Sequence, residues 1–478
     1  MEQSKFIRTL RRLNKHEQQR YLDFLQSPYF NKNEDISRFA ALVLQRKTPI
    51  NQQKIYSSLY PGKTFDARRI PDLMYKSLRL LEEFLSEEQY GGQSWERKLN
   101  LLSYIRVNEL DDLNSVIHRE IHELSSKKQF RDSNYFYEEF MYQSEAYKIF
   151  LDRSQIKGDD ILQKKVDQLD LFYLSAKLRD SCEMMNRKRI LAIDYEFHLL
   201  DDLINNIQAN LKRYEGYPAI SIYYHILLML REPEITDHFN VLKNEIQEHI
   251  QLFAQDEQRS LYGYLQNYCI LKVNTGVSEF YRELLNIYQH MMGIKLMVAD
   301  NKNLQWDLKN MVSVALRLEE YDWTFNTINE IKNRLPEEIR ENSYTYNLAN
   351  YYYETKNYKK ATRLLQAVDF KDIYYNLDSK SMLLKIYFEQ EEEESFLALV
   401  AAFKTYLTRN KLISVDRYHS YHNFLKFSRK AFVFKTGLPY EQKRNSNKIK
   451  LLKDKLLQTK NVVNLNWLIK EMEGLLKD

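Results

Sequence analysis

Three consecutive residues, Gly62, Lys63 and Thr64, match the end of the phosphate-binding loop found in many nucleotide-binding proteins. In that loop, backbone N–H groups surround the phosphates, the lysine neutralises their charge and the hydroxyl binds magnesium. The motif needs an earlier glycine where this chain has Ser57, and Pro71 interrupts the helix that should receive the phosphates. No buried strand precedes the motif. We therefore expect a Pro-Gly turn between two helices here.

Two pairs of histidines have spacings that place both rings on one face of a helix, as a metal site requires. No third ligand is identifiable near either pair. In the first pair, Glu120 stands one place away from the position of a metalloprotease base. Solvated or locally hydrogen-bonded rings are therefore the favoured interpretation. The pairs are His118 with His122, and His419 with His422.

The two cysteines, Cys182 and Cys269, stand among helix-forming residues and belong to no CxxC pair or nucleophile–base motif. Glycine-rich dinucleotide loops and GxSxG nucleophile motifs are also absent from the sequence. We expect both thiols to be buried as small apolar groups in a protein of the reducing cytoplasm. The sequence predicts no catalytic residue, metal site or cofactor, although a site assembled from distant residues stays open.

Tyrosine is concentrated between residues 343 and 375, where there are eight of them. Three in succession, Tyr351, Tyr352 and Tyr353, span about 200° of a helix circumference, so they cannot all point into a core. A rigid ring with a polar tip is a good interface anchor. We therefore predict that Tyr346, Tyr351 and Tyr353 bind a partner. The alternative is that tyrosine is simply the preferred large packing residue of this chain.

A basic stretch lies near the C-terminus, where residues 426–460 contain eleven Lys and Arg against two acidic residues. Phenylalanines are interleaved with its first cations. That pattern suits a phosphate backbone with stacked bases, and such binding weakens as salt rises. The alternative is the polar outer face of helices that cap a helical array. The candidate anion-binding residues are Lys426, Arg429, Lys430, Lys443 and Arg444.

The N-terminal ninety or so residues have the pattern of a small helical module. A capping box, Asn14-x-x-Glu17, opens one helix, and Asp66 leads into a long amphipathic helix. That long helix carries four basic residues, which makes the module a candidate DNA-reading head. Four glutamates crowd its end and no wing-like strands follow, so DNA binding stays an alternative. The basic residues are Arg68, Arg69, Lys76 and Arg79.

The composition indicates that the candidate residues described above all lie on helices or in the short turns between them. With only 10 Gly and 8 Pro in 478 residues, few positions can form tight turns, and 44% hydrophobic residues exclude wholesale disorder. No strand-period segments alternate with the helical ones. The longest apolar runs fall far short of the roughly 20 residues of a membrane span. The net charge of +5 makes no demand for a nucleic-acid partner.

The C-terminal third contains three copies of one helical pattern, at steps of 37 and then 35 residues. Each copy is followed by a second amphipathic segment, so the pattern predicts successive helix hairpins. The breaks marked by Asn274-Thr275-Gly276 and Leu335-Pro336 separate such segments. The three first helices carry Met311-Val312-x-x-Ala315, Leu348-Ala349-x-x-Tyr352 and Leu383-Leu384-x-x-Tyr387.

The middle copy resembles the tetratricopeptide repeat (TPR) family. It matches that family's small residue at Ala349, its aromatic residue at Tyr352, and the aromatic and small residues after the turn at Tyr358 and Ala361. The family's opening tryptophan is replaced by Thr345, and the flanking copies depart further. The resemblance is clearest over residues 308–403. It implies a right-handed α-solenoid of antiparallel helix hairpins whose concave surface binds a protein or peptide.

These observations lead to four expected segments and one leading function. We expect a non-enzymatic, cytoplasmic helical-repeat scaffold that mediates protein–protein interaction through its repeats. The alternative is a nucleic-acid-associated helical protein or regulator that uses the basic C-terminus or the N-terminal module. The expected segments are an N-terminal helical module at 1–91, degenerate helical hairpins at 92–300, TPR-like repeats at 301–410 and basic capping helices at 411–478.

Overall fold

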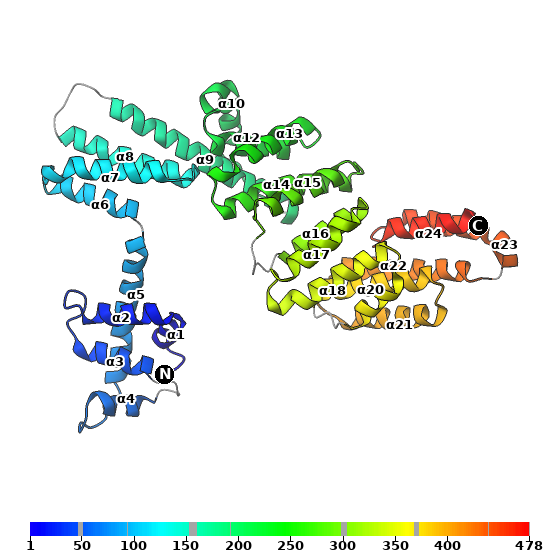
Figure 1. Cartoon of the computed structure of the whole chain (residues 1–478), viewed down its shortest axis with the longest axis horizontal. Coiled ribbons are helices and arrows are strands. Elements are labelled where there is room, and N and C mark those ends of the chain that lie inside the picture. The colour runs from blue at the N-terminus through cyan, green and yellow to red at the C-terminus, as the bar shows by residue number, and fades with distance from the viewer. Residues whose placement is uncertain are drawn as a thin grey trace. The chain divides into compact units, whose positions relative to one another are not determined.

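The computed structural model describes residues 1–45, 51–92, 94–152, 160–191, 193–297, 304–367, 372–437 and 439–477, without the side chains of 189–191, 439–445 and 477. Every regular element in these ranges is a helix (Figure 1). The predicted all-α class is therefore confirmed. None of the helices in these ranges is long and apolar enough to cross a bilayer.

The chain divides into two compact units, and each is built from two stretches of sequence. The first unit comprises Met1–Ser181 and Phe197–Tyr223, and the second comprises Cys182–Glu196 and Tyr224–Asp478. This division falls inside the segment expected at 92–300. It does not test the boundaries expected at residues 91, 300 and 410, which stay predictions.

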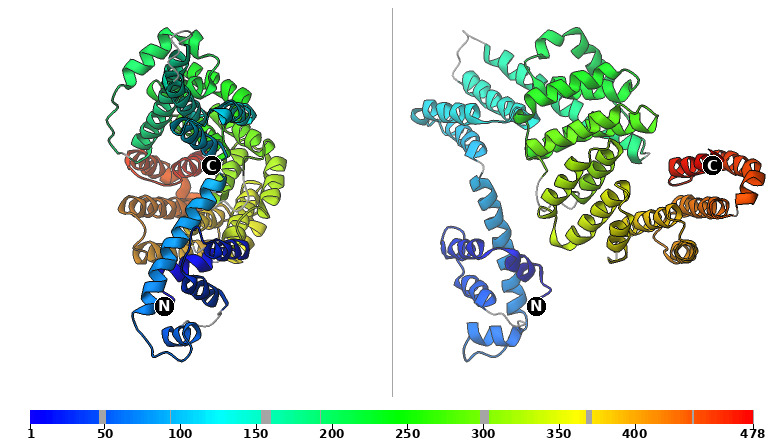
Figure 2. Two further views of the ribbon diagram at one scale, coloured as in Figure 1. Left: turned by 90° about the vertical axis from the view of Figure 1, so that its left-hand side faces the viewer. Right: turned by 45° about the vertical axis from the view of Figure 1, so that its right-hand side comes forward.

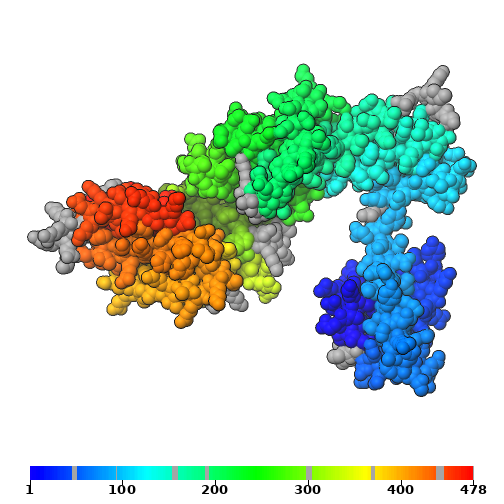
Figure 3. Space-filling view, turned by 180° about the vertical axis from the view of Figure 1, so that it is seen from behind, coloured from blue at the N-terminus to red at the C-terminus, as the bar shows by residue number. Residues whose placement is uncertain are grey.

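The first five helices enclose a hydrophobic cluster of their own, in which α5 packs against each of the other four. Figure 3 shows the atoms of these helices, in blue, gathered in one mass. The capping box is confirmed: the Glu17 N–H donates to the Asn14 side chain at 2.9 Å, and the Asn14 N–H donates to the Glu17 carboxylate at 2.8 Å. The helices are α1 (Lys5–Arg12), α2 (Lys15–Gln26), α3 (Glu34–Gln45), α4 (Gln52–Leu59) and α5 (Arg69–Gly92).

The motif that resembles a phosphate-binding loop lies in the turn between α4 and α5. Gly62 has a φ of 78°, a left-handed conformation that glycine adopts without strain. The Lys63 ammonium lies 5.6 Å from the centre of the Tyr60 ring, and the next helix does not begin until Arg69. The predicted Pro-Gly turn between two helices is therefore confirmed. The double glycine at 91–92 lies within the last turn of α5, which ends at Gly92.

The rest of the first unit is also helical, and ion pairs supplement its apolar contacts. Arg106 on α6 donates to Glu145 on α8 at 2.7 Å, and this carboxylate is nearly buried. The helix α9 contributes residues to both units, as does α12 (Pro218–Arg231). The elements are α6 (Ser94–Val107), η1 (Asp111–Leu113), α7 (Asn114–Lys127), α8 (Ser133–Asp152), α9 (Asp160–Leu191), α10 (Leu200–Ala209) and α11 (Leu211–Tyr214).

The second unit begins with helices that pack through large aromatic side chains. The rings of Phe239 on α13 and Tyr268 on α14 are stacked 5.1 Å apart, and Phe280 on α15 meets both of them edge-on. In sequence order, α13 packs on α14, α14 on α15 and α15 on α16. The elements are α13 (Thr236–His249), η2 (Ile250–Leu252), α14 (Gln255–Asn274) and α15 (Phe280–Gly293).

Three successive helix hairpins follow, and they correspond to the three sequence copies (Figure 2). The first helices α16, α18 and α20 pack on one another in that order, and each also packs on the second helix of its own hairpin. The equivalent positions Val312, Ala349 and Leu384 are fully buried, which confirms the predicted packing positions. The helices are α16 (Leu304–Arg317), α17 (Tyr321–Lys332), α18 (Glu337–Glu354), α19 (Tyr358–Ala367), α20 (Ile373–Glu389) and α21 (Glu393–Arg409).

Each of these hairpins turns through a residue in the left-handed conformation. Glu319, Lys356 and Glu391 have φ values of 60°, 61° and 59°, and they recur at the same steps of 37 and 35 residues. The N–H of the following residue donates back into the helix each time, as from Asn357 to the Tyr352 carbonyl at 2.8 Å. This is the Schellman arrangement that satisfies the last carbonyls of a helix.

The C-terminal helices continue the hydrophobic cluster of the hairpins. Trp467 meets Phe388 and Phe424 edge-on at 5.1 and 6.0 Å, while Leu468 and Met472 are fully buried. The last amphipathic helix expected from the sequence is therefore present and covers the end of this cluster. The helices are α22 (Val415–Lys435), α23 (Pro439–Gln458) and α24 (Leu465–Lys477).

Candidate functional site

A pocket with mostly polar walls lies among the first helices α16, α18 and α20, and we call it the polar pocket. Its volume is about 520 Å³, within the range of pockets that hold small ligands or parts of a peptide. Asn464 and Lys470, just before and within α24, complete its wall. Its other lining residues are Lys309, Ser313, Leu316, Arg317, Glu319, Tyr321, Tyr346, Asn350, Tyr353, Glu354, Asp378, Ser381, Met382 and Lys385.

Equivalent positions of the three sequence copies converge on the polar pocket. On α16 the lining includes residues spaced four apart, which share one face of a helix. The residues 37 positions after these also line the pocket, from α18. For two of the three, the residue a further 35 positions on, in α20, lines it as well. Each first helix thus presents the same stripe to the pocket. The equivalent sets are Lys309, Tyr346 and Ser381; Ser313, Asn350 and Lys385; and Arg317 with Glu354.

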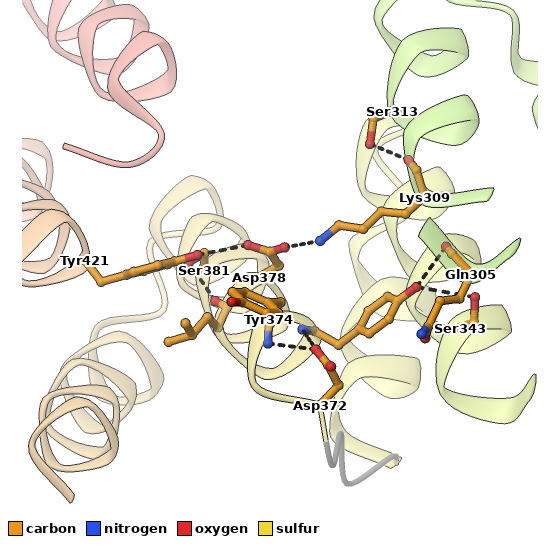
Figure 4. Close-up of polar contacts among 11 residues, drawn as sticks. Gln305, Lys309, Ser313, Ser343, Asp372, Tyr374, Asp378, Ser381 and Tyr421 are labelled. Atoms are coloured by element: carbon orange, nitrogen blue, oxygen red, sulfur yellow. Dashed lines mark hydrogen bonds and ion pairs between the residues drawn. The ribbon is translucent and has the colours of Figure 1, made fainter. Parts of the chain in front are cut away.

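One wall of the polar pocket is held by an ion pair that joins α16 to α20. Lys309 pairs with Asp378, and the Tyr421 hydroxyl on α22 donates to the same carboxylate at 3.1 Å (Figure 4). A second bond between α20 and α16 runs from the Tyr375 hydroxyl, which donates to the backbone carbonyl of Gln305 at 3.2 Å. These bonds link the first hairpin, the third hairpin and α22.

Aromatic rings surround the ammonium of Lys309. It lies 5.6, 5.2 and 5.3 Å from the ring centres of Trp306, Tyr346 and Tyr375. Because the faces of aromatic rings carry negative potential, they stabilise a cation that has lost part of its water. Burial raises the pKa of Tyr346 well above its usual value, so the phenol stays neutral. Tyr346 therefore lines the pocket as a buried ring that supports Lys309.

A second carboxylate, Glu389, ties the second and third hairpins to the C-terminal helix α24. It accepts hydrogen bonds from the hydroxyls of Tyr353, at 2.6 Å, and Tyr358, and from Trp467 Nε1 at 3.1 Å. Lys356 pairs with it at 3.1 Å. Burial alone would raise the pKa of Glu389, but these donors outweigh burial and lower the pKa. Tyr353 is thus occupied by a bond within the protein, and its ring is buried.

Lys385 is a cation of the polar pocket without a carboxylate partner. Its ammonium lies 5.9 and 5.8 Å from the rings of Tyr353 and Trp467. Among the described residues, no Asp or Glu lies within ion-pair distance of it. Burial lowers the pKa of Lys385, since the charged form has lost water that nothing fully replaces. An anionic group entering the pocket would restore part of that lost stabilisation.

The three predicted partner-binding tyrosines do not gather in one place. Tyr346 and Tyr353, seven positions apart, both line the polar pocket. Tyr351 lies elsewhere, half-exposed, with its ring 5.3 Å from Phe325 and 5.5 Å from Tyr352. Because each residue of a helix is rotated by about 100° from the one before it, Tyr351 and Tyr353 lie on different faces of α18. Partner binding by these residues stays a prediction, and burial leaves little of Tyr346 and Tyr353 to touch a partner.

Among the known protein families, curated proteins and solved structures that we compared with the chain, none matches it significantly.

Three of the predicted anion-binding residues lie together on α22. Lys426, Arg429 and Lys430 line a second pocket of about 720 Å³ among α21, α22 and α23. We call this the basic pocket. The side chains of Lys443 and Arg444 lie outside the described residues.

The other candidate chemical groups have local partners. His118 Nδ1 lies 2.9 Å from the Tyr142 hydroxyl, and the described residues include no group of three or more His, Cys, Asp or Glu arranged for a metal. The rings of Tyr418 and His422 are stacked 5.9 Å apart. Cys182 and Cys269 are buried, as predicted, and burial raises the pKa of both thiols. These thiols are therefore weak nucleophiles.

Sequence reasoning missed the charged residues of the polar pocket. Lys309 and Lys385 could have been found, since they stand at the repeat steps from Tyr346 and Asn350. Asp378 offered no such signal, and neither did the contact between Glu389 and Trp467. Trp467 meets Glu389 across 78 residues of sequence, and only tertiary packing brings the two together.

Proposed function

We propose that this protein is a non-enzymatic scaffold that binds a protein or peptide partner in the polar pocket. The proposal includes the arrangement implied by the TPR resemblance, a right-handed solenoid of antiparallel helix hairpins with the first helices on its concave side. The observation that carries it is the convergence of equivalent repeat positions on one pocket. In a repeat array, equivalent positions of successive units form a continuous binding surface.

The side chains of the pocket suit a peptide. Ser313 and Asn350 offer hydrogen-bonding groups for a peptide main chain. Arg317, Lys385 and Lys470 offer cations for acidic side chains, and Glu354 offers a carboxylate for a basic one. Such a mixture of both signs favours a partner of defined sequence over a uniformly charged polymer, because like charges in the wrong register are repelled.

The test is recovery of partners from native lysate by the wild-type protein and four variants. Arg317→Glu and Asn350→Ala alter exposed or half-exposed side chains of the pocket. Arg409→Glu and Asn326→Ala are the controls, since both residues are exposed and lie outside the lining. We expect the two pocket variants to lose specific partners that the controls retain, at unchanged melting temperature. Equal recovery by all variants, or no specific partner for the wild type, would contradict the proposal.

The alternative is a nucleic-acid-associated protein, and the cations of the basic pocket favour it. The N-terminal module supports it less. Arg69 pairs with Asp35, Lys76 with Asp72 and Arg79 with Glu82, so these side chains are engaged within the protein. A salt titration against mixed DNA and RNA tests the alternative, since phosphate contacts weaken as salt rises. Absence of affinity at low salt would remove it.

A further inference from the structure

The basic pocket has an apolar floor. Val400 from α21, Leu425 and Val433 from α22, and Leu451 and Leu452 from α23 all contribute to it. None of its lining residues belongs to the polar pocket, so the two are separate surfaces. Apolar side chains do not stabilise a purely ionic ligand, because a phosphate or a free carboxylate loses hydrating water when it contacts them.

Cations with no carboxylate partner among the described residues line the pocket beside this floor. Six Lys and Arg line the pocket and none of the lining residues is acidic. Within the described residues, none of the six lies within ion-pair distance of a carboxylate. The cations that face α24 are different: Lys435 pairs with Glu471, and Lys453 pairs with Glu473 at 2.7 Å. The six are Lys404, Lys426, Arg429, Lys430, Lys448 and Lys455.

The electrostatic field of these cations extends to His422 at the edge of the floor. Burial lowers the pKa of His422, and the charges of Lys404 and Lys426 lower it further. The imidazole is therefore neutral at physiological pH and adds no charge of its own. The pocket is thus a positively charged site that attracts an anionic ligand over a distance.

The exposure of the floor distinguishes among anionic ligands. The side chains of Val433 and Leu451 are 61% and 71% exposed, so the pocket is an open groove rather than a closed cavity for a lipid chain. Apart from His422, Phe434 is the aromatic residue of its lining, so the described wall offers little surface on which bases could stack. An open groove with aliphatic contacts fits a ligand that has one apolar face and one acidic face.

The spacing of charges along α23 fits a helix. Lys448 and Lys455 are seven positions apart, or two turns and about 10 Å, with Leu451 and Leu452 between them. A partner helix that repeats acidic residues at the same interval, with leucines between, is complementary to this pattern. Cations on α21 and α22 also line the groove. Docking of an amphipathic helix into such a groove is a common recognition mode.

We propose that the basic pocket binds the apolar face of an acidic amphipathic helix of a partner protein. Leucines of that helix would cover Val433, Leu451 and Leu452, and its carboxylates would pair with the surrounding lysines and arginine. This second docking surface does not depend on the polar pocket being a binding site.

The probe is a fluorescently labelled synthetic peptide of about 20 residues, with leucine at the core positions of a heptad repeat and glutamate beside them. Its affinity is measured by anisotropy for the full-length protein and its variants. Leu451→Asp and Lys448→Glu alter the pocket. Leu457→Asp and Lys450→Glu make the same changes on the same helix outside it. All four residues are exposed, so the fold should persist.

We expect Leu451→Asp and Lys448→Glu each to weaken binding by at least about tenfold, equivalent to about 1.4 kcal/mol. The two matched controls and Arg317→Glu in the polar pocket should stay within about twofold of the wild type. A scrambled peptide of the same composition should bind at least about tenfold more weakly, because its leucines do not share one face.

Several outcomes would overturn the proposal. These are no binding of the acidic peptide, equal binding of the scrambled peptide, or equal losses in the control variants. Mixed-sequence single-stranded DNA and RNA, and vesicles containing phosphatidylserine, are titrated in parallel. If either binds more tightly than the peptide, and loses affinity with Lys448→Glu but not with Lys450→Glu, the basic pocket is a nucleic-acid or membrane surface instead.

Discussion

At the scale of single residues, tyrosine has a role in this protein beyond packing. Tyr421 donates to Asp378, and Tyr353 and Tyr358 donate to Glu389, so phenol groups replace the water that these carboxylates lose on burial. Burial raises the pKa of Tyr353 and Tyr421, so both remain donors at any physiological pH. Abundant tyrosine thus lets charged residues sit between packed helices.

Asp307, in the first turn of α16, should make the stability of the second unit depend on pH. Burial raises the pKa of Asp307 to about 6, although the charge of Arg259 opposes the shift. The unfolded chain loses this proton near pH 4, so folding takes up a proton between about pH 4 and 6. Stability therefore falls as pH rises through that window. Asp307→Asn should stabilise the protein by about 1–3 kcal/mol at pH 7, and by little at pH 4.

The measurement is urea unfolding of the wild type and variant at both pH values. Asp322→Asn is the control, since Asp322 occupies the first turn of α17 but is exposed. That substitution removes only a favourable charge at a helix N-terminus and should cost a few tenths of a kcal/mol. A stabilisation by Asp307→Asn that is the same at both pH values would contradict the assignment.

At the scale of elements, the hairpin turns carry a recurring strain. Glu319, Lys356 and Glu391 occupy a left-handed conformation that glycine adopts more easily. The strain at Lys356 is partly offset, because its ammonium pairs with Glu389. Glu391 is exposed, and the described structure includes no ion pair from it. Glu319 is exposed too, but it lines the polar pocket. The third hairpin therefore offers the clearest place to relieve the strain.

Glu391→Gly should stabilise the second unit by about 0.5–1 kcal/mol, because removing the Cβ relieves more free energy than the extra freedom of the unfolded chain costs. Thermal unfolding measures the change. Glu394→Gly is the matched control: it makes the same substitution three positions later, inside α21, and should destabilise by about 0.5–1 kcal/mol. If both variants shift the melting temperature in the same direction, the turn is not strained as described.

At the scale of the whole molecule, stability is divided between two units. The cluster of α1–α5 and the cluster that runs from α18 to α24 share no residue, and each lies within one unit. The net charge of +5 is also unevenly distributed, since the basic pocket holds six cations and no acid. We therefore expect the two units to contribute separately to folding.

We expect calorimetry to show at least two unfolding transitions, because the two units hold separate cores. Trp467→Ala should lower one of them, since Trp467 packs on Phe388 and Phe424 in the second unit; the cost should be about 2–4 kcal/mol. Phe84→Ala should lower the other, since Phe84 lies in the α1–α5 cluster. A single transition shifted equally by both variants would show that the chain unfolds as one body.

Much of the local structure could be predicted because helices are encoded by residues close together in sequence. The capping box of Asn14 and Glu17 and the turn at Gly62 depend on neighbours within a few positions. The buried face that carries Val312, Ala349 and Leu384 is marked by local helical spacing, although other helices cover it. The left-handed residues of the three hairpin turns recur at the same steps of 37 and 35 residues as the sequence copies. The helical class and the hairpin order of residues 304–409 were therefore readable from the sequence.

The candidate sites could be predicted only in part. Lys426, Arg429 and Lys430 were recognised because they are neighbours in sequence, and they do line one pocket. The tyrosines were identified by abundance, which does not reveal whether a ring faces solvent or a buried carboxylate. Tyr353 is buried against Glu389, while Tyr351 lies on another face.

By itself, then, the sequence determined which segments are helical, where the hairpins turn and how often they repeat, because backbone hydrogen bonds and caps are local. Only the tertiary structure decided that Lys309 meets Asp378, 69 residues away, and that Trp467 meets Glu389. Those contacts depend on how hairpins stack, and the energy of stacking is spread over many small apolar contacts. No local pattern specifies which charged side chains the stacking will bring together.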